Sequence, residues 1–384
     1  MKTISPLKTV AIGITIAGLT TANIASATEL RFATGAPQNT LGTKAMDAFI
    51  EAVENRSGGD ISVKGYAQSL LSFMETPTGL RDGIADLGHV LTPYFPSDFP
   101  NTIMLTELTM ALELADVSSQ DAVFAYTGAI SEYVINNCPE CLKEHLDRNQ
   151  IFLGLASSSP YGLFCNEAIT SKEDIEGKRI RIGGPQWSRW VDAMGGTPVS
   201  IPVNETYEGL SQGVVDCTAH NLSDYLNFKF IEVASEVTMG VPGGTFGGVG
   251  TNMNADAWKS LSEKDRTSIL YGAATTSAEI AKVYLENHQE ALRRIDKQPE
   301  LTLHEPDEEF RQMTRDFIEE DLKKVAANYS ERYDVQRADA KMDEFQQLLD
   351  EWVGKVEGIE TREQLRDLYW QEVFSKVDVS SYGI

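Results

Sequence analysis

The feature that most constrains the fold is an alternation of strand-like and helix-like segments. Residues 29–33 alternate apolar and polar side chains, residues 46–53 place apolar side chains at helical spacing, and residues 61–66 begin a second strand. The pair Gly58-Gly59 ends the intervening helix. This pattern predicts a β-α-β unit.

The same alternation continues along the chain. Because strands separated by helices favour parallel sheets, we expect parallel sheets with a ligand at the carboxyl ends of their strands. Further strands are predicted at residues 85–91, 151–155, 161–165, 180–182 and 214–219, with a helix at 187–194.

A long helix is predicted beyond Ser262. Ser262 opens a capping box, and the helical pattern runs on towards Pro299, which is about 50 Å at 1.5 Å per residue. Shorter helices follow around residues 310–325 and from Thr361, which opens a second capping box. A helix of that length is expected to span two lobes.

The first 27 residues resemble a secretory leader. Two lysines precede an apolar stretch at about residues 10–19, and Ala25-Ser26-Ala27 is a small-x-small cleavage pattern. The apolar stretch is about half of the ~20 residues that a membrane-spanning helix needs. We therefore expect a cleaved signal peptide at residues 1–27 and a soluble protein outside the cytoplasmic membrane.

Length and charge limit what the mature chain can be. Removing 27 residues from 384 leaves 357, more than the ~250–300 at which a single core stops growing, so two lobes are expected. The formal charge of −24 argues against nucleic acid or an anionic membrane as a partner. An anion site would have to be a local basic focus.

Four cysteines in an exported chain favour structural disulfides, with Cys138–Cys141 and Cys165–Cys217 as the favoured pairing. Half of a zinc site and a thioredoxin-like dithiol are the alternatives for the C-P-E-C segment. Zinc would need a second ligand pair, whereas the five histidines are scattered. A dithiol motif normally begins a helix after an early strand, whereas this segment is predicted to be a polar loop.

Arg181 is the strongest candidate for a ligand contact. It lies at the end of a short apolar strand, directly before Gly183-Gly184-Pro185, where a side chain can project into a cleft. A guanidinium offers two parallel donors that match a carboxylate, and a lysine does not. The segment therefore predicts a carboxylate site.

Several segments together resemble one family. Their order along the chain resembles that of the solute-binding proteins of tripartite ATP-independent periplasmic (TRAP) transporters, the dicarboxylate-binding-protein family, through about Glu320. The matching segments are GKRIRI…GGTPVSIPVNETYEGLSQGVVD at residues 177–216, KFIEVA at 229–234, NADAW at 254–258, FIEAVENRSGGDISVKGY at 49–66 and GLRDGIADLGHV at 79–90.

The resemblance implies an α/β clamp of two lobes, with crossover strands and a long lobe-spanning helix, that closes on a small organic acid in the periplasm. It also implies delivery to a membrane permease of two subunits, with no cofactor and a monomeric chain. The expected lobes are residues 28–158 plus 246–285 for lobe I, and 159–245 plus 286–384, with the C-terminal helices, for lobe II.

The resemblance also suggests pocket residues. It places Arg181 on the ligand carboxylate and His220 at a ligand-facing position, beside Asn221. Trp187 and Trp190 share a helix face and either stack on the ligand or pack in the core. The remaining candidates lie where strands end near the cleft: Tyr161, His89, Thr92, Tyr94 and Tyr207.

Two departures and several rival classes complete the expectations. Cys217 stands where the family usually has glycine, and no carboxylate follows in Cys-Thr-Ala-His-Asn, which disfavours a metal-mediated site.

An enzyme is disfavoured because Gly-x-Ser-x-Gly and His-Glu-x-x-His are absent. The glycine-rich residues 240–250 lack a phosphate-loop ending and are predicted to pass tightly near a hinge. The binding protein of an ATP-driven importer, a sensor partner and a secreted hydrolase are the alternatives. The residues do not choose between aromatic, sugar, hydroxy, keto and dicarboxylic acids.

Overall fold

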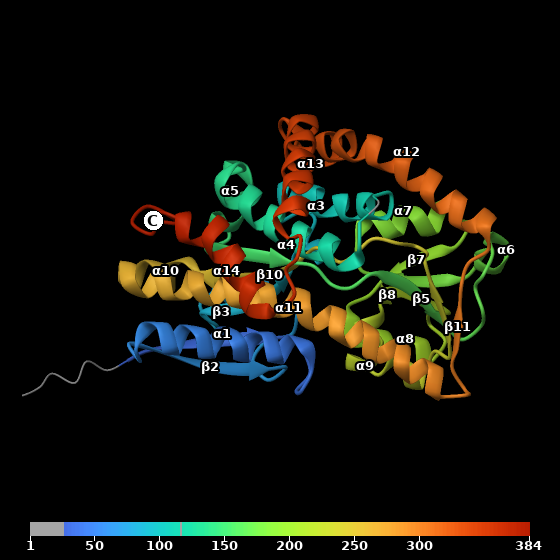
Figure 1. Ribbon diagram of the computed structural model, residues 1–384, viewed down its shortest axis with the longest axis horizontal. Helices are drawn as coiled ribbons and strands as arrows, with labels where there is room; N and C mark the ends of the chain where they lie inside the picture. Colours follow the sequence, from blue (N-terminus) through green and yellow to red (C-terminus); the bar gives the residue numbers. More distant parts are fainter. Residues whose placement is uncertain (1–26, 116) are drawn as a thin grey trace, which may run out of the picture.

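Two lobes lie side by side, each built around its own sheet (Figure 1). The computed structural model describes residues 27–115 and 117–384, so the predicted signal peptide lies outside the described residues up to Ser26. In this part of the chain, no helix is long and apolar enough to cross a membrane.

The first sheet has the order β2 (Ile61–Ala67), β1 (Thr28–Thr34), β3 (Leu87–Leu91), β10 (Val249–Asn254) and β4 (Gln150–Ala156). The second has the order β11 (Thr302–His304), β9 (Glu236–Met239), β5 (Tyr161–Cys165), β8 (Cys217–Asn221), β6 (Arg179–Ile182) and β7 (Thr197–Ser200).

The predicted β-α-β unit is confirmed. Strands β1 and β2 pair in parallel, and α1 (Leu41–Ser57) connects them. The helix ends at Gly58, whose φ of 70° lies in the left-handed region that glycine adopts without strain. Phe49 and Val53 are fully buried in the core of the first lobe.

Both sheets are mixed, so the prediction of parallel sheets is wrong. Strand β10 runs antiparallel to β3 and β4, and β5 runs antiparallel to β8 and β9. The chain enters the second lobe between β4 and β5 and returns between β9 and β10, and the returning strand runs against its new neighbours. The predicted crossover strands are therefore present.

The glycine-rich segment forms the return passage between the lobes. A Cβ atom on Gly247 would lie 2.4 Å from the Tyr126 hydroxyl oxygen, and one on Gly248 would lie 2.2 Å from Pro93 Cδ. These contacts require glycine, which agrees with the prediction of a tight backbone passage.

Helix α11 (Glu263–Lys297) joins the two lobes, as predicted. Its 35 residues correspond to about 52 Å, and the Ser262 side chain caps its first turn. On the first lobe, Thr276 Oγ1 donates to the Ala45 carbonyl at 3.0 Å, and on the second lobe the Ser223 hydroxyl donates to the Tyr284 carbonyl. Figure 1 shows the helix running from the first lobe, where it lies next to α1, to the second lobe.

The C-terminal helices correct the predicted lobe assignment. Helices α13 (Ala338–Lys355) and α14 (Arg362–Glu372) pack on α4 (Ser119–Asn136) and belong to the core of the first lobe, not the second. Trp352 Nε1 donates to Glu132 at 2.7 Å, and the Tyr369 hydroxyl donates to the Phe124 carbonyl at 2.8 Å. Their apolar side chains share one core with those of α4, and the order of segments along the chain does not show this contact. The other lobe boundaries stay a prediction.

The remaining elements are short apart from α12, which crosses from the second lobe back to the first (Figure 1). The α-helices are α2 (Thr76–Arg81), α3 (Pro100–Thr106), α5 (Pro139–Leu146), α6 (Lys172–Ile175), α7 (Pro185–Ala193), α8 (Val203–Ser211), α9 (Leu222–Asn227), α10 (Ala255–Ser260) and α12 (Glu308–Tyr333). The 3₁₀ helices are η1 (Thr92–Tyr94), η2 (Glu107–Glu113), η3 (Phe230–Glu232) and η4 (Phe374–Lys376).

Both predicted disulfides are present in the structure. Cys165 and Cys217 are paired residues on the neighbouring strands β5 and β8, and Cys138 is bonded to Cys141. The C-P-E-C segment is not the predicted polar loop, because Cys138 is the N-cap of α5 and Pro139 begins that helix. Both of its cysteines are fully buried, which is a structural rather than a catalytic environment.

Candidate ligand-binding site

A cavity lies between the two lobes. It encloses about 630 Å³ of unfilled space, including its opening to solvent. Side chains of the first lobe, the second lobe, the return passage and α11 all contribute to its wall, which is mainly apolar. The lining residues are Ala36, Thr40, Gly42, Phe73, His89, Leu91, Tyr94, Ser158, Tyr161, Val203, His220, Asn221, Asp224, Asn227, Phe228, Phe246, Val249, Ile280 and Tyr284.

Arg181 lies behind the Tyr94 side of this cavity and is fully buried. Its Nε donates to the Ile201 carbonyl at 3.0 Å, and its Nη2 donates to the Tyr94 hydroxyl at 2.7 Å. Its Nη1 has no hydrogen-bond partner among the described residues. A buried guanidinium without a carboxylate partner is costly, so one donor remains available for an anion.

The glycine after this strand keeps space around the guanidinium. A Cβ atom on Gly183 would lie 3.3 Å from Arg181 Nη1 and 3.4 Å from the Tyr161 hydroxyl oxygen. The first distance is tighter than an ordinary van der Waals contact, and the second is at the lower limit of one. Glycine at this position therefore leaves the unpartnered nitrogen and the phenol free of a methyl group.

Three aromatic rings stack at the back of the cavity. The Tyr161 ring lies 3.8 Å from the Trp187 ring and 5.5 Å from the His220 ring, nearly parallel to both. Trp187 is fully buried, and its Nε1 donates to the Gly243 carbonyl at 3.0 Å. Trp187 therefore supports Tyr161 and does not line the cavity itself.

His220 is held as a neutral ring. Its Nδ1 accepts the backbone N–H of Asn221 at 2.9 Å, which leaves the proton on Nε2. Burial lowers the pKa of His220 well below 6.5, and the nearby charge of Arg181 lowers it further. The ring therefore offers one neutral N–H donor.

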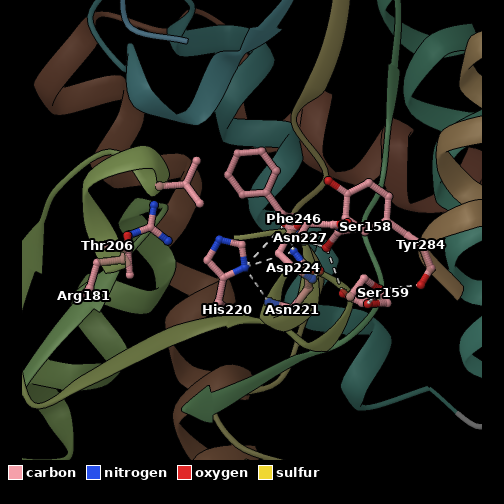
Figure 2. Close-up of polar contacts among 12 residues, drawn as sticks. Ser158, Ser159, Arg181, Thr206, His220, Asn221, Asp224, Asn227, Phe246 and Tyr284 are labelled. Atoms are coloured by element: carbon pink, nitrogen blue, oxygen red, sulfur yellow. Dashed lines mark hydrogen bonds and ion pairs between the residues drawn. The ribbon is translucent and has the colours of Figure 1, made fainter. Parts of the chain in front are cut away.

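Asp224 supplies a carboxylate to the opposite side of the His220 ring from Arg181 (Figure 2). Its oxygens accept from Asn221 Nδ2 at 2.8 Å and from Asn227 Nδ2 at 2.9 Å. Burial raises its pKa from 3.8 to about 6, although both asparagine hydrogen bonds and Arg181 oppose the shift.

His89 brings a polar group from β3 of the first lobe. Its Nδ1 shares a 3.1 Å hydrogen bond with Thr34 Oγ1, and its Nε2 has no partner in the described part of the chain. Burial lowers the pKa of His89 to about 4, so the ring is neutral at pH 7. The cavity thus has polar groups from both lobes.

The predicted pocket residues separate into two groups. His89, Tyr94, Tyr161, His220 and Asn221 line the cavity. Arg181 is not one of the lining residues, but it donates to the hydroxyl of Tyr94, which is one of them.

Three other candidates lie away from the cavity, and we withdraw them as ligand contacts. Trp190 packs on Phe310 and donates to Thr314, Thr92 is buried against the Gly248 carbonyl, and the Tyr207 hydroxyl donates to Glu232 at the surface. None of the three lines the cavity, and within the described residues none forms a side-chain hydrogen bond with a residue that does. Trp190 fails because, on α7, it faces α12 rather than the cleft.

Sequence reasoning missed Asp224, Phe246 and Tyr284. Asp224 follows the N-cap Asn221 by three residues, and that spacing after a predicted site residue was a usable signal. Tyr284 lies one helical turn beyond Ile280 on α11, and no sequence signal distinguishes the cavity face of so long a helix. Among the described residues, no group of three or more His, Cys, Asp or Glu side chains is arranged to hold a metal ion.

Comparison with known protein families decides the class of the protein. Residues 32–328 match the family model described as bacterial extracellular solute-binding protein, family 7. The chain belongs to this family. The resemblance to TRAP solute-binding proteins is therefore confirmed, and an α/β fold of this type is what the structure shows.

Relatives and solved structures of this family-7 protein agree. A solute-binding protein of Chromohalobacter salexigens is 23% identical over 66% of this chain and 72% of its own. The periplasmic ectoine-binding protein of the TeaABC TRAP transporter of Halomonas elongata has a TM-score of 0.70 at 20% identity, over 84% of this chain and 99% of its own. A TRAP solute-binding protein from an unidentified microbe of a marine metagenome, specific for aromatic acids and bound to 3-hydroxybenzoate, has a TM-score of 0.69 at 20% identity, over 85% and 99%.

Proposed function

We propose that this family-7 protein binds a small organic acid in the periplasm and delivers it to a TRAP-type membrane permease, with Arg181 pairing the ligand carboxylate. The observation that carries this proposal is the fully buried guanidinium of Arg181, whose Nη1 lacks a partner beside a cavity between two lobes. A carboxylate would restore the charge balance and form a strong, charge-assisted hydrogen bond.

The ligands of related proteins support this choice. The structural relative from the marine metagenome binds 3-hydroxybenzoate, which carries a carboxylate. Another TRAP solute-binding protein, from Bradyrhizobium, is bound to galacturonate, also a carboxylate. The resemblance to these proteins lies in the fold, and the carboxylate is the chemical group that their ligands share with the group Arg181 can hold.

Closure of the two lobes on the ligand is part of the proposal. The Tyr94 hydroxyl of the first lobe accepts from Arg181 and from the Val203 backbone N–H at 3.2 Å, both in the second lobe. Asn204 Nδ2 also donates to the Gly35 carbonyl across the cleft at 3.0 Å. A ligand that touches His89 and Arg181 would contact both lobes, so binding would favour the closed arrangement.

The test is a binding screen of organic acids with a matched arginine variant. Wild type should gain thermal stability with at least one acid, because a ligand at 100 times its Kd stabilises by about 2.7 kcal/mol. Arg181→Ala should then weaken binding of that acid by roughly thirty-fold to a few thousand-fold, because truncating one member of a buried charge pair costs about 2–5 kcal/mol.

Arg179→Ala is the matched control. Arg179 lies on the same strand, is half exposed and pairs with Asp216, so its removal should leave ligand affinity unchanged. Wild-type affinity in Arg181→Ala would contradict the proposed role of Arg181. Uptake of the acid by vesicles that contain the TRAP permease encoded with this protein, only when the protein is added, would test delivery.

A further inference from the structure

We propose that the natural ligand carries a protonated nitrogen as well as a carboxylate, and that Asp224 is the residue that selects it. This inference rests on the proposed function and names the ligand class more narrowly: an amino or imino acid with an apolar body. It adds a negative subsite to the positive one at Arg181.

Asp224 faces the cavity without a cationic partner. It is 5% exposed and lines the cavity wall, and its carboxylate accepts from two neutral amides, Asn221 and Asn227. No lysine or arginine in the described part of the chain lies within ion-pair distance of it. His220 Nδ1 is 3.7 Å away, but that nitrogen already accepts the Asn221 N–H and so carries no proton.

Helix capping does not account for this carboxylate. The first turn of α9 is capped by the Asn221 side chain, which accepts from the Asp224 backbone N–H at 3.0 Å. The hydrogen bonds of the Asp224 carboxylate run to side chains of Asn221 and Asn227 instead. These two amides therefore orient the carboxylate, and the Tyr284 hydroxyl and the more distant charge of Arg181 also favour its ionised form. Within the described residues the carboxylate still forms no ion pair with a lysine or arginine.

The cavity is electrically polarised. Figure 2 shows the Arg181 guanidinium on one side of the His220 ring and Asp224 on the other. The pKa of Asp224, raised to about 6 by burial, still leaves the carboxylate mostly ionised at pH 7. The polar His220 ring lies between the two charges, and much of the remaining cavity wall is apolar, with side chains that include Phe73, Leu91, Phe246, Val249 and Ile280.

A zwitterion matches this arrangement better than a plain acid. Its carboxylate meets Arg181, its ammonium group meets Asp224, and its carbon body meets the apolar wall. A plain carboxylic acid would leave Asp224 buried and unpaired, and closure over an unpaired charge is costly. A hydroxyl group would donate one hydrogen bond to Asp224 without neutralising its charge.

The experiment compares sets of ligands that share one carbon skeleton. Suitable sets are leucine, 2-hydroxy-4-methylpentanoate and 4-methylpentanoate; proline, tetrahydrofuran-2-carboxylate and cyclopentanecarboxylate; and 3- and 4-aminobutanoate with their hydroxy and unsubstituted analogues. Kd is measured by titration calorimetry at pH 7.5. In at least one set the ammonium member should bind wild type at least thirty-fold more tightly than the unsubstituted acid.

Two variants and one control assign the effect to Asp224. Asp224→Asn should weaken binding of the ammonium ligand at least thirty-fold and should strengthen binding of the unsubstituted acid, because no unpaired charge is then buried on closure. Asp224→Ser repeats the test if the isosteric amide disturbs Asn221. Asp216→Asn, which removes an acid that pairs with Arg179 away from the cavity, should change neither affinity.

The outcomes separate the two proposals. If plain or hydroxy acids bind as tightly as the ammonium member in every set, or if both Asp224 variants weaken all members equally, the inference about Asp224 is wrong while the proposed function stands. If no acid in any set binds while the wider screen of organic acids yields a ligand, the inference is wrong and the proposed function stands. If no organic acid in the wider screen binds, or if Arg181→Ala leaves binding intact, the proposed function fails and the inference fails with it.

Discussion

Arg181 and Arg189 lie only eight residues apart, yet their surroundings are opposite. Arg181 has no carboxylate partner and donates to Tyr94, which lines the cavity. Arg189, on α7, donates from Nε and Nη2 to the Asp321 carboxylate, at 2.7 Å in each case, and also binds Glu107. The Tyr329 hydroxyl adds a 2.6 Å hydrogen bond to Glu107.

The two arginines differ in whether the protein itself supplies their carboxylate partners. Glu107 comes from η2 of the first lobe, Arg189 from the second lobe, and Asp321 from α12, so this cluster ties three parts of the molecule together. Burial raises the pKa of Glu107, and Arg189 opposes that shift. A buried charge whose partners are all present stabilises the assembled fold, whereas a buried charge that lacks a partner leaves room for a ligand.

The largest effect on folding is expected from Arg189→Ala. The substitution would leave Glu107 buried without its cation, and breaking a buried pair in this way costs about 3–5 kcal/mol. Urea denaturation of the unliganded protein measures the loss. Arg179→Ala, which breaks a half-exposed pair with Asp216, should cost far less, because solvent screens an exposed ion pair. Equal losses in the two variants would contradict the distinction.

Arg181→Met should show the reverse pattern. It removes a buried guanidinium that has no carboxylate partner, so the free energy of unfolding without ligand should stay within about 1 kcal/mol of wild type. Ligand affinity should still fall at least thirty-fold, through loss of about 2 kcal/mol or more. A loss of stability as large as that of Arg189→Ala would show that Arg181 is structural.

Asp224 should give the protein a pH dependence of stability. Its pKa is about 6 in the folded protein, against an ordinary value of 3.8, so between about pH 4 and pH 6 only the folded state keeps the proton. Folding then takes up a proton, and stability falls as the pH rises, by at most about 3 kcal/mol. The groups that face this carboxyl are Arg181, His220, Tyr161 and Tyr284.

Denaturation of wild type and Asp224→Asn at pH 4 and pH 7 tests this dependence. The variant should gain on wild type as the pH rises. Asp216→Asn should change little relative to wild type over this range, because the hydrogen bond with Arg179 lowers the pKa of Asp216 from 3.8 and so places its titration in the folded state below pH 4. A stability difference between wild type and Asp224→Asn that does not vary with pH would contradict the assigned state of Asp224.

The smallest effect is expected from Gly183→Ala. The new methyl group would lie 3.3 Å from Arg181 Nη1, where it would crowd a ligand carboxylate and weaken binding by about threefold to tenfold. Gly354→Ala, a helical position with no atom within 4 Å of the added carbon, is the control and should not alter affinity. Unchanged affinity in Gly183→Ala would place the carboxylate elsewhere.

Sequence patterns predicted those features that depend on local order. The β-α-β unit, the cap at Ser262 and the length of α11 follow from residue spacing, and the pairing of Cys165 with Cys217 agrees with their facing positions on β5 and β8. The place of Arg181 beside Gly183 could also be anticipated, because a strand end and a glycine turn lie next to each other in the chain.

Features that depend on contacts between distant segments could not be predicted in this way. Helices α13 and α14 pack on α4 through contacts between residues more than two hundred positions apart in the chain. The start of α5 was missed because Cys138 was not recognised as its N-cap. Trp187 and Trp190 are equivalent by sequence spacing, yet one supports Tyr161 and the other packs on Phe310.

The sequence by itself determined the family of the protein and the position of Arg181 at a strand end before a glycine turn, because family segments and strand ends are local and ordered along the chain. Only the tertiary structure decided which charges are paired. Glu107 and Asp321 meet Arg189 although they are far from it in sequence, while Asp224, much closer to Arg181 in sequence, forms no ion pair with it. Burial and distance in space, not spacing along the chain, set the electrostatic cost of each charge. They therefore distinguish Arg189, whose carboxylate partners are supplied by the fold, from Arg181, which has none.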